Sequence, residues 1–420
     1  MSVLQSTHTA WMEPARLVVQ NLAVSHRQLR IAVVTETYPP EVNGVAMTTG
    51  RVVDGLLQQG HQIQLIRPRQ NAEELPAQSE SFQEMLSHGI PIPRYNHLKM
   101  GLPARQALIR AWSICRPDIV QVVTEGPLGW SAVSAARKLR LPVITEFHTN
   151  FHTYSRYYGI GWLKQPVAAY LRRFHNKGDL TLVPTESLRT ELLDSGYAHV
   201  EVVARGVDTQ LFSPERRSEQ LRLRWNAGPE TLVCVFVSRL APEKNIELAM
   251  RAFDEVIAQH PDARLVLVGD GPSRASLQAR YPQHVFAGMR TGVDLAEHFA
   301  SGDCFLFPSL TETFGNVITE ALASGLPVLG FDYAATAELV RHENNGLIAP
   351  FGDEATFIAI AKRFGSEPAL LRAMKKHARD SVLRVDWQAI IARLAGILDL
   401  TIESHTSRQQ ARRGMAVQME

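Results

Sequence analysis

The sequence is poor in the residues that mark secreted, disulfide-bonded or membrane-spanning proteins. Only 3 of its 420 residues are cysteine, at positions 115, 234 and 304, which are too far apart along the chain for a disulfide framework or a Cys-x-x-Cys metal knuckle. No run of about eighteen apolar residues occurs, and residues 1–30 hold no signal-peptide pattern. We therefore expect buried free thiols and a cytoplasmic protein whose membrane contact, at the inner face of the cytoplasmic membrane, is at most peripheral.

Two motifs of nucleotide-dependent enzymes are also missing. No Asp-x-Asp pair occurs, which disfavours an enzyme that holds a diphosphate through a divalent cation, so we expect neither a metal nor a cofactor. No G-x-G-x-x-G follows the first apolar run, which counts against a dehydrogenase. The formal net charge of +2 does not favour nucleic acid as a partner. Residues 1–208 are nevertheless mildly basic.

What the sequence does contain is a soluble globular composition, 45% hydrophobic and 20% charged, over a length that suits two domains. Short apolar runs alternate with longer amphipathic ones, which is typical of strands and crossover helices in a parallel sheet. We expect strands at 31–37, 63–67, 119–124, 143–147, 180–184 and 200–203, and again at 232–238, 264–269, 284–287, 304–308, 327–331 and 346–349.

This alternation predicts an α/β protein with two doubly wound, Rossmann-like domains that face each other across a cleft. Ligands of such sheets bind outside the carboxyl ends of the strands. The expected division is an N-terminal extension at 1–29, domains at 30–205 and 230–385, a linker at 206–229, a helix at 386–403 that packs back on the first domain, and a tail at 404–420. The extension and the tail lack a core pattern, so we expect them to be mobile.

Two glycine-containing loops follow expected strands and precede expected helices. Asn43 and Gly44 lie in Pro-Glu-Val-Asn-Gly-Val after the first strand, and Gly269 and Gly271 lie in Gly-Asp-Gly-Pro. Glycine lets a backbone approach a ligand closely, and a helix N-terminus offers free amides to a phosphate. Ordinary turn chemistry explains either loop about as well.

The most informative segment runs from Pro308 to Val328. A strand end is followed by Thr-Glu-Thr-Phe-Gly and then by a helix that begins near Gly315. Backbone amides of Phe314, Gly315, Asn316 and Val317 can therefore face a phosphate. Glu312 in the loop and Glu320 on the helix suit two hydroxyl-bearing parts of one extended ligand, although solvated acids are the commoner fate of glutamate.

Taken together, these motifs resemble the retaining glycosyltransferases of family 4, which have the GT-B fold, over about residues 30–390. The resemblance rests on Glu312 and Glu320 as E-x7-E and on Ser-Arg239-Leu-Ala-Pro-Glu-Lys244. It implies that Glu312 lies near the donor sugar, that Glu320 binds the nucleotide ribose, and that the two cations grip the donor diphosphate. His148, in Glu-Phe-His-Thr-Asn, matches the family's histidine near the transferred sugar.

Chemistry supports the roles of the two cations. A departing nucleoside diphosphate gains negative charge as the glycosidic bond breaks, and fixed cations stabilise that charge. Arg239 binds oxygens as a planar fork and Lys244 as a point charge. Solvated surface cations are the alternative reading of both residues.

The segment around 157–177 carries the expectation about the acceptor. It combines aromatic and apolar residues with cations, and the residues expected on the membrane or acceptor side are Trp162, Lys164, Arg172, Arg173 and Lys177. A basic amphipathic segment of this kind can lie on an anionic membrane surface. A normal domain helix with solvated charges is equally compatible with the pattern. The block resembles the subgroup of lipid-directed mannosyl, glucosyl and sulfoquinovosyl transferases.

The resulting hypothesis is a hexosyltransferase that uses a nucleotide diphosphate sugar, GDP-mannose or a UDP-hexose, as donor and a membrane lipid such as diacylglycerol as acceptor. Retention of configuration follows from the resemblance alone. Three alternatives remain open at this point: a nucleotide-sugar epimerase on the same scaffold, a transferase with a soluble or polysaccharide acceptor, and a non-catalytic protein that binds sugar nucleotides.

Overall fold

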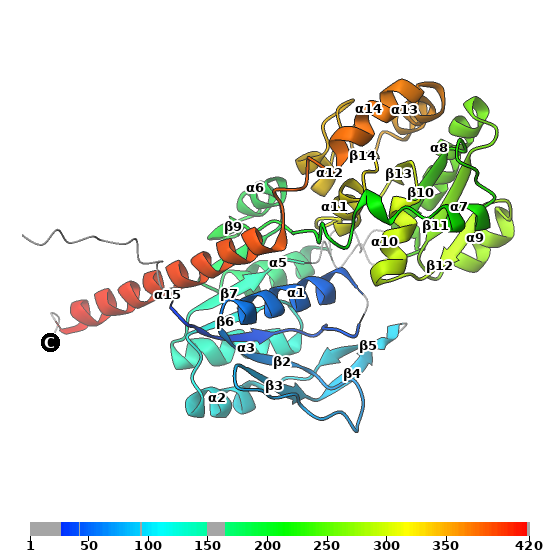
Figure 1. The fold of residues 1–420 in the computed structure, drawn as a ribbon. Helices are drawn as coiled ribbons and strands as arrows, with labels where there is room; N and C mark the ends of the chain where they lie inside the picture. The colour runs from blue at the N-terminus through cyan, green and yellow to red at the C-terminus, as the bar shows by residue number, and fades with distance from the viewer. Residues whose placement is uncertain (1–26, 42, 93–94, 149–163, 418–420) are drawn as a thin grey trace, which may run out of the picture.

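The structure is a computed structural model that describes residues 27–41, 43–92, 95–148 and 164–417. It consists of two α/β domains, each built on a parallel sheet with helices on its faces (Figure 1). The predicted class, two doubly wound Rossmann-like domains, is therefore confirmed. Trp162 lies outside the described residues, as does the N-terminal segment 1–26.

The first domain holds a seven-stranded sheet in the order β3-β2-β1-β6-β7-β8-β9. Its strands are β1 (Arg30–Val34), β2 (Gln62–Pro68), β3 (Phe82–Ser87), β6 (Ile119–Val122), β7 (Val143–Glu146), β8 (Leu180–Val183) and β9 (Val200–Val202). Its helices are α1 (Gly44–Gln58), α2 (Arg105–Ile114), α3 (Pro127–Leu139), α5 (Lys164–His175) and α6 (Glu186–Asp194). The central strands are buried on both faces, which explains their continuous apolar runs.

The second domain holds a six-stranded sheet in the order β12-β11-β10-β13-β14-β15. Its strands are β10 (Val233–Val237), β11 (Arg264–Val268), β12 (Val285–Gly288), β13 (Cys304–Phe307), β14 (Val328–Phe331) and β15 (Gly346–Ala349). Its helices are α7 (Glu219–Arg224), α8 (Ile246–Gln259), α9 (Arg274–Arg280), α10 (Gly292–Ala300), α11 (Asn316–Ala323), α12 (Ala334–Leu339), α13 (Glu354–Ser366) and α14 (Pro368–Ala378), with short 3-10 turns η2 (Pro214–Arg216) and η3 (Pro242–Lys244).

In both sheets the strand order reverses beside the first strand of the domain. In the first sheet β1 lies between β2 and β6, and in the second sheet β10 lies between β11 and β13. The loops that leave such neighbouring strands diverge to opposite faces of the sheet, and this opens a binding position at the strand ends. The loops after β1, β10 and β13 are therefore where this fold places a ligand.

Three strands were not expected from the sequence. β3 is an edge strand whose residues are mostly half-exposed, and β4 (Gly89–Ile92) forms an antiparallel hairpin with β5 (Tyr95–Gly101). Edge strands need no apolar run, because water covers one of their sides. The pattern of buried strands therefore could not reveal them.

The sequence analysis predicted a linker at 206–229. This prediction is wrong, because the stretch belongs to the second domain. The side chains of Phe212, Leu221 and Trp225 are buried in the same cluster as the strands of the second sheet. Arg222 is fully buried and donates hydrogen bonds to the backbone carbonyls of Ser301 and Thr231. A polar sequence concealed this core contribution, since the apolar residues are widely spaced.

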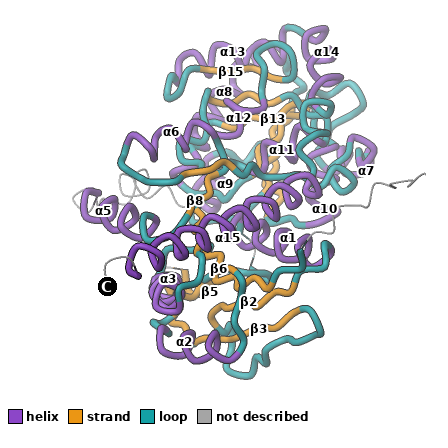
Figure 2. Tube along the Cα trace, turned by 90° about the vertical axis from the view of Figure 1, so that its left-hand side faces the viewer, coloured by secondary structure: helices purple, strands orange, loops and turns teal. Residues whose placement is uncertain are grey.

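The chain crosses between the domains twice, and the two crossings lie side by side. The amide of Val207 donates to the carbonyl of Val385 at 3.0 Å, and Val207 bridges Asp386 in parallel register. After the second crossing, α15 (Trp387–Val417) runs back across the first domain (Figure 2). Its residues Ile391, Leu394 and Leu398 share the core of β1 and α1.

The sequence analysis also predicted a mobile tail from residue 404. This prediction is wrong, because α15 continues unbroken to Val417. His405 and Arg408 both contact Asp179 Oδ1, at 3.0 and 2.7 Å. Asp179 also accepts a hydrogen bond from the amide of Val143, the first residue of β7. These polar contacts hold the helix at residues 405–408, where the sequence shows no apolar periodicity.

The start of the first domain also lies earlier than predicted. Leu29 is fully buried and its amide donates to His61 Nδ1 at 3.2 Å, while Arg27 pairs with Asp118. Residues 27–29 are thus part of the domain and not of a mobile extension.

Candidate active site

Two cations lie where the strand order of the second sheet reverses. Arg239 follows the end of β10, and Lys244 closes the short turn η3 just beyond it. β10 is hydrogen-bonded to β13, whose loop carries Glu312. The fold therefore brings the three residues to one edge, as a shared diphosphate sugar site requires.

Lys244 and Glu312 contact each other directly. The Lys244 ammonium Nζ pairs with Glu312 Oε1, and Ser309 Oγ donates to the same oxygen at 2.7 Å. Both side chains are largely buried, with 12% and 13% of their surface exposed. The hydroxyl of Tyr333 donates to the backbone carbonyl of Glu312 at 2.7 Å and fixes the loop. A ligand anion at this position would thus meet a cation that is already held in place.

Arg239 is oriented by a neighbour that the sequence analysis did not identify. Its Nη2 donates to Glu243 Oε1, and the Glu243 side chain is fully buried whereas 35% of the Arg239 side chain is exposed. A buried carboxylate is unfavourable unless a cation pairs with it, so the ion pair with Glu243 holds the Arg239 guanidinium in place. The signal in the sequence was the four-residue spacing between the two.

The glycines of the Gly-Asp-Gly loop support the Arg239 loop. Gly269 has φ +132°, and a Cβ placed there would lie 1.9 Å from the carbonyl oxygen of Ser238. A Cβ on Gly271 would lie 2.5 Å from the carbonyl oxygen of Leu240. The two loops are therefore packed backbone against backbone on either side of Arg239. The structure shows this packing role for the glycines, and donor contact stays a prediction.

The helix expected near Gly315 begins there. Gly315 is the N-cap of α11 with φ +98°, and the amides of Asn316 and Val317 open the helix. The ring of Phe314 is buried in the core of the second domain, so this side chain anchors the loop and does not face a ligand. The prediction for Phe314 concerned its backbone amide, and donor contact by that amide stays a prediction.

Glu320 lies on α11, as predicted, and Glu312 in the preceding loop. Burial raises the pKa of the Glu320 carboxyl to about 7. Within the described part of the chain, no residue donates a hydrogen bond to this carboxylate. A half-buried carboxyl group without a protein partner is suited to receive hydroxyl groups from a ligand.

The first domain meets this edge through the start of α1. Asn43 is the N-cap of α1, and its Oδ1 accepts hydrogen bonds from the amides of Val45 and Ala46. Asn316 Nδ2, from the second domain, lies 3.4 Å from Thr48 Oγ1 and near Gly44. Asn43 therefore shapes the helix terminus, whereas Gly44 leaves room at the domain junction.

His148 follows β7 and is held by two charged groups. Its Nε2 lies 2.7 Å from Glu146 Oε2, and its Nδ1 lies 2.7 Å from Arg205 Nη2. Burial raises the pKa of Glu146, but contact with His148 and Arg205 outweighs this effect and lowers the pKa to about 2. The sequence analysis found the histidine and missed both partners, since neither belongs to a recognisable motif.

Comparisons with known proteins decide the family. The description "Glycosyltransferase Family 4" matches residues 42–211, and "Glycosyl transferases group 1" matches residues 231–364. A GDP-mannose-dependent alpha-mannosyltransferase of Mycobacterium tuberculosis (strain CDC 1551 / Oshkosh) is 34% identical over 378 residues, which cover 88% of this chain and 96% of that protein. The chain belongs to the family 4 glycosyltransferases.

Other relatives of this glycosyltransferase share lower identity. Sulfoquinovosyl transferase SQD2 of Arabidopsis thaliana is 28% identical over 332 residues, covering 77% of this chain and 64% of that protein. Alpha-monoglucosyldiacylglycerol synthase of Streptococcus pneumoniae is 29% identical over 317 residues, covering 72% and 70%. The predicted resemblance to mannosyl, glucosyl and sulfoquinovosyl transferases is therefore confirmed.

Solved structures show the same fold. Sucrose-phosphate synthase of Thermosynechococcus elongatus superimposes with a TM-score of 0.72 at 18% identity, covering 90% of this chain and 100% of that one. HepE of Anabaena, in complex with UDP and glucose, gives a TM-score of 0.70 at 18% identity, covering 89% and 100%. The glycosyltransferase therefore has the predicted GT-B fold.

The cations expected on the acceptor side of the glycosyltransferase lie along α5. Arg172 and Arg173 are exposed in the last turn of this helix, and Arg172 Nη1 donates to the carbonyl of Ser195. Lys177 Nζ lies 5.9 Å from the centre of the Trp130 ring. The side chain of Lys164, the first residue of α5, lies outside the described residues.

This placement does not test the expectation that these cations lie on the membrane or acceptor side. A crossover helix in a parallel sheet starts at the carboxyl ends of the strands and ends at the opposite edge. Arg172, Arg173 and Lys177 therefore lie away from Lys244 and Glu312 and do not touch a reacting group. A contact with the membrane surface stays a prediction for them.

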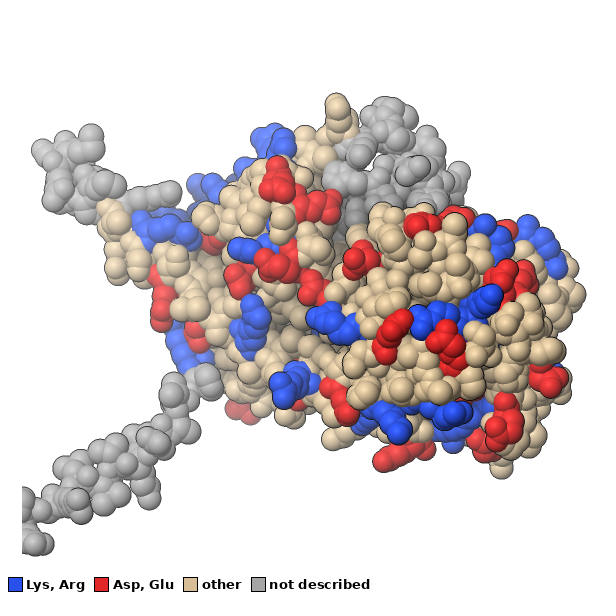
Figure 3. Space-filling model, turned by 90° about the horizontal axis from the view of Figure 1, so that it is seen from above, with Lys and Arg blue, Asp and Glu red and all other residues tan. Residues whose placement is uncertain are grey.

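One face of the molecule carries charges of both signs. On the face seen in Figure 3, Lys and Arg side chains alternate with Asp and Glu side chains and form no continuous basic band.

Among the described residues, no helix is both long and apolar enough to cross a membrane.

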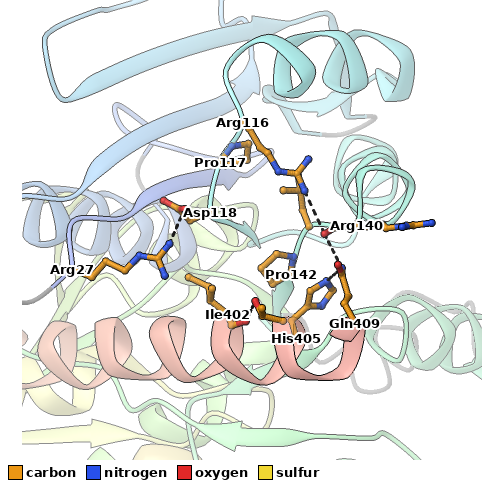
Figure 4. Close-up of a pocket in the computed structure, with 11 residues that line it drawn as sticks. Arg27, Arg116, Pro117, Asp118, Arg140, Pro142, Ile402, His405 and Gln409 are labelled. Carbon is orange, nitrogen blue, oxygen red and sulfur yellow. Dashed lines mark hydrogen bonds and ion pairs between the residues drawn. The ribbon is translucent and has the colours of Figure 1, made fainter. Parts of the chain in front are cut away.

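A pocket of about 270 Å³ lies at the opposite edge of the first sheet, between the starts of β6 and β7 and helix α15 (Figure 4). Three of its charged groups have partners within the protein. Arg27 pairs with Asp118, Arg116 donates to the carbonyl of Leu139, and His405 contacts Asp179. The parallel strands direct their amino ends toward it, so it is separate from the candidate active site.

Replacing Glu320 by Gln should remove a pH dependence from nucleotide binding. The carboxyl must ionise to accept hydrogen bonds from two hydroxyls, so we expect wild-type affinity for GDP or UDP to rise as pH increases from about 6 to 8 around the pKa near 7. The Gln variant should bind more weakly at pH 8 and show a flat profile by isothermal titration calorimetry.

The stability of the unliganded protein should change in the opposite direction. Because the pKa of Glu320 is raised in the folded state, the folded protein binds more protons than the unfolded chain between about pH 4.5 and 7, and stability falls as pH rises through this window. Glu320→Gln should therefore melt higher than wild type at pH 8. Glu255→Gln, at an exposed position on α8, is the control. Equal nucleotide profiles for wild type and Glu320→Gln would contradict the assignment.

Proposed function

We propose that this glycosyltransferase transfers a hexose, with retention of configuration, from a nucleotide diphosphate sugar to a membrane lipid acceptor. The observation that carries the proposal is the convergence of Arg239, Lys244 and Glu312 at the strand-order reversal of the second sheet. The N-terminus of α11 and the half-buried Glu320 carboxyl adjoin the same loop. This set matches an anionic diphosphate flanked by a ribose and a sugar.

The proposed chemistry assigns each group a separate task. Arg239 and Lys244 stabilise the negative charge that grows on the diphosphate as the bond from its oxygen to the sugar's anomeric carbon breaks. The acceptor hydroxyl oxygen forms the new bond on the same face, and its proton passes to the departing phosphate oxygen. Glu312 orients the sugar and Glu320 holds the ribose. The amides of Asn316 and Val317 add hydrogen bonds to phosphate.

The proposed acceptor class rests on the relatives. One is named for sulfoquinovosyl transfer and another for the synthesis of monoglucosyldiacylglycerol. The name of the Mycobacterium tuberculosis relative specifies GDP-mannose as donor. We therefore place GDP-mannose first among the donors to be tested and a diacylglycerol-type lipid first among the acceptors.

The direct test follows radiolabelled GDP-mannose, UDP-glucose and other UDP-hexoses with and without diacylglycerol vesicles. Transfer of label into the lipid fraction, with an α-linkage by NMR, is the expected result. Label released as free sugar in all conditions, recovered as an epimerised nucleotide sugar, or transferred equally to a soluble glycan would each overturn the lipid-transfer proposal. Binding of donor without any turnover would indicate a regulatory protein.

Removing divalent cations should leave the activity largely unchanged. Among the described residues, no group of three or more His, Cys, Asp or Glu side chains is arranged to hold a metal ion, and Lys244 and Arg239 supply the positive charge instead. The measurement is the initial rate before and after treatment with EDTA. A complete loss of activity after EDTA, with recovery on adding magnesium or manganese, would show that a metal ion binds the diphosphate.

Membrane attachment should be peripheral and sensitive to salt. Arg172 and Arg173 are exposed at the end of α5, and each cation near an anionic surface contributes about 1 kcal/mol. Replacing both by Gln should weaken co-sedimentation with phosphatidylcholine–phosphatidylglycerol vesicles roughly tenfold or more. High salt should do the same to wild type.

The control variant for this experiment changes two arginines of the second domain. Arg251 and Arg280 are each 50% exposed and paired with glutamates, so Arg251→Gln with Arg280→Gln removes the same charge elsewhere. An equal effect of both double variants would indicate general attraction and not attachment through α5. Binding that ignores salt would contradict the electrostatic contact.

A further inference from the structure

Glu146, His148 and Arg205 form a buried polar network at the carboxyl end of β7. Arg205 Nη2 lies 2.7 Å from His148 Nδ1, and Glu146 Oε2 lies 2.7 Å from His148 Nε2 and 3.8 Å from Arg205 Nη1. Gln121 Nε2 donates to the second oxygen of Glu146. The side chains of His148, Glu146 and Arg205 expose only 4%, 10% and 11% of their surface.

The charges of the partners determine the state of the His148 ring. A guanidinium only donates hydrogen bonds, so Nδ1 beside Arg205 must be the accepting nitrogen. The ring proton is then on Nε2, which lies 2.7 Å from Glu146 Oε2 but is not aligned for a hydrogen bond to it. Nδ1 is thereby engaged within the protein and is not free to take a proton in the reaction.

The network also joins three parts of the molecule that are remote in sequence. Arg205 belongs to the first crossing between the domains, where its neighbour Gly206 packs against Trp387 at the start of α15. Glu146 and His148 belong to the end of β7 in the first domain. The carbonyl of His148 accepts a hydrogen bond of 2.6 Å from Thr313 Oγ1 in the second domain, next to Glu312.

We propose that Arg205 and Glu146 are positioning residues, which fix His148 so that its carbonyl holds the Thr313 loop and sets the position of Glu312 against the first domain. This inference rests on the proposed function, because it assigns the network to the alignment of the donor loop with the acceptor side. It also changes the expectation for His148, whose contribution is the fixed position of its backbone carbonyl and not proton transfer through Nδ1, which Arg205 occupies. Residues that align reacting groups contribute to turnover far more than to nucleotide affinity.

Neutralising the charges of Arg205 and Glu146 distinguishes a positioning role of this network from a purely structural one. Removing one member of a buried ion pair leaves an uncompensated charge and destabilises the fold, whereas replacing both by neutral groups avoids that penalty. Arg205→Gln alone should therefore melt at a lower temperature. Combining it with Glu146→Gln should restore the melting temperature to near that of wild type.

The decisive experiment compares turnover in this double variant with its stability. If the network positions His148, turnover should stay at least tenfold below wild type while the affinity for GDP or UDP, which the second domain holds through Glu320, stays within about twofold. The control is Arg393→Gln with Glu201→Gln, which neutralises an exposed pair at 3.1 Å on the first domain. Wild-type turnover in a stable Glu146/Arg205 double variant would overturn the proposal.

Histidine NMR provides a test that needs no sugar transfer. In protein with labelled histidine, the signal assigned through His148→Gln should show an unprotonated Nδ1 and a protonated Nε2 in wild type. Arg205→Lys, which keeps the charge and loses the planar fork, should shift this signal and lower turnover. A protonated Nδ1 in wild type would overturn the proposal even if the enzyme transferred no sugar in the donor and acceptor panel, an outcome that would count against the proposed function alone.

Discussion

Replacing Lys244 by Ala is expected to lower the rate of sugar transfer by about 10²-fold or more. The ammonium group lies beside Glu312 at the strand-order reversal, with 12% of the side chain exposed. In this partly desolvated place a fixed cation stabilises a developing phosphate charge more strongly than it would in water. The loss should appear in kcat, measured from initial rates with saturating donor.

The matched control for Lys244→Ala is Lys375→Ala. Lys375 lies in the same domain and pairs with Asp303 at 3.0 Å, with 34% of its side chain exposed. This substitution removes the same group from a position beside the amino end of β13, opposite the carboxyl ends, and should leave kcat within about twofold of wild type. If the rate for Lys244→Ala matched that of the control, the assignment of the diphosphate site to this edge would be wrong.

Replacing Gly269 by Ala should destabilise the second domain by about 3 kcal/mol or more. Its φ of +132° is costly for any residue with a Cβ, and the new Cβ would lie 1.9 Å from the carbonyl oxygen of Ser238. Relief of this overlap must displace the loop that carries Arg239. We expect the melting temperature of that domain to fall by about 6–12 °C and donor binding to weaken with it.

Gly228→Ala is the control for this backbone effect. The nearest atom to a Cβ at Gly228 is Thr231 Oγ1 at 3.9 Å, which is an ordinary contact. Its melting temperature should therefore match that of wild type in differential scanning calorimetry. If Gly269→Ala melted like Gly228→Ala, the close packing of the two loops would not exist in solution.

Much of the fold could be predicted because its central strands are buried on both faces. Ile31, Val33 and Val120 are fully buried, and such strands show as continuous apolar runs in the sequence. The edge strand β3 and the residues of α15 beyond 404 carry no such signal. These segments are held by half-exposed or polar contacts, whereas apolar periodicity in a sequence reveals only residues that are buried.

The candidate site was predictable in part for a related reason. Arg239 and Lys244 stand five positions apart, and the loop that carries Glu312 precedes α11 directly, so local spacing reveals their order on strand, loop and helix. The contacts of His148 were not predictable. Arg205 lies 57 residues away, and no local pattern states which strand ends become neighbours.

The sequence by itself determined the two α/β domains, the order of their strands along the chain and the family motifs of the donor loop, because these depend on local periodicity and spacing. The tertiary structure alone decided which remote residues meet. Strand order places Cys234 Sγ 3.2 Å from Cys304 Sγ on paired strands, pairs Lys244 with Glu312, and surrounds His148 with Glu146 and Arg205. Such contacts arise from the pairing of distant strands and the docking of two domains, and neither process leaves a periodic trace in the amino-acid order.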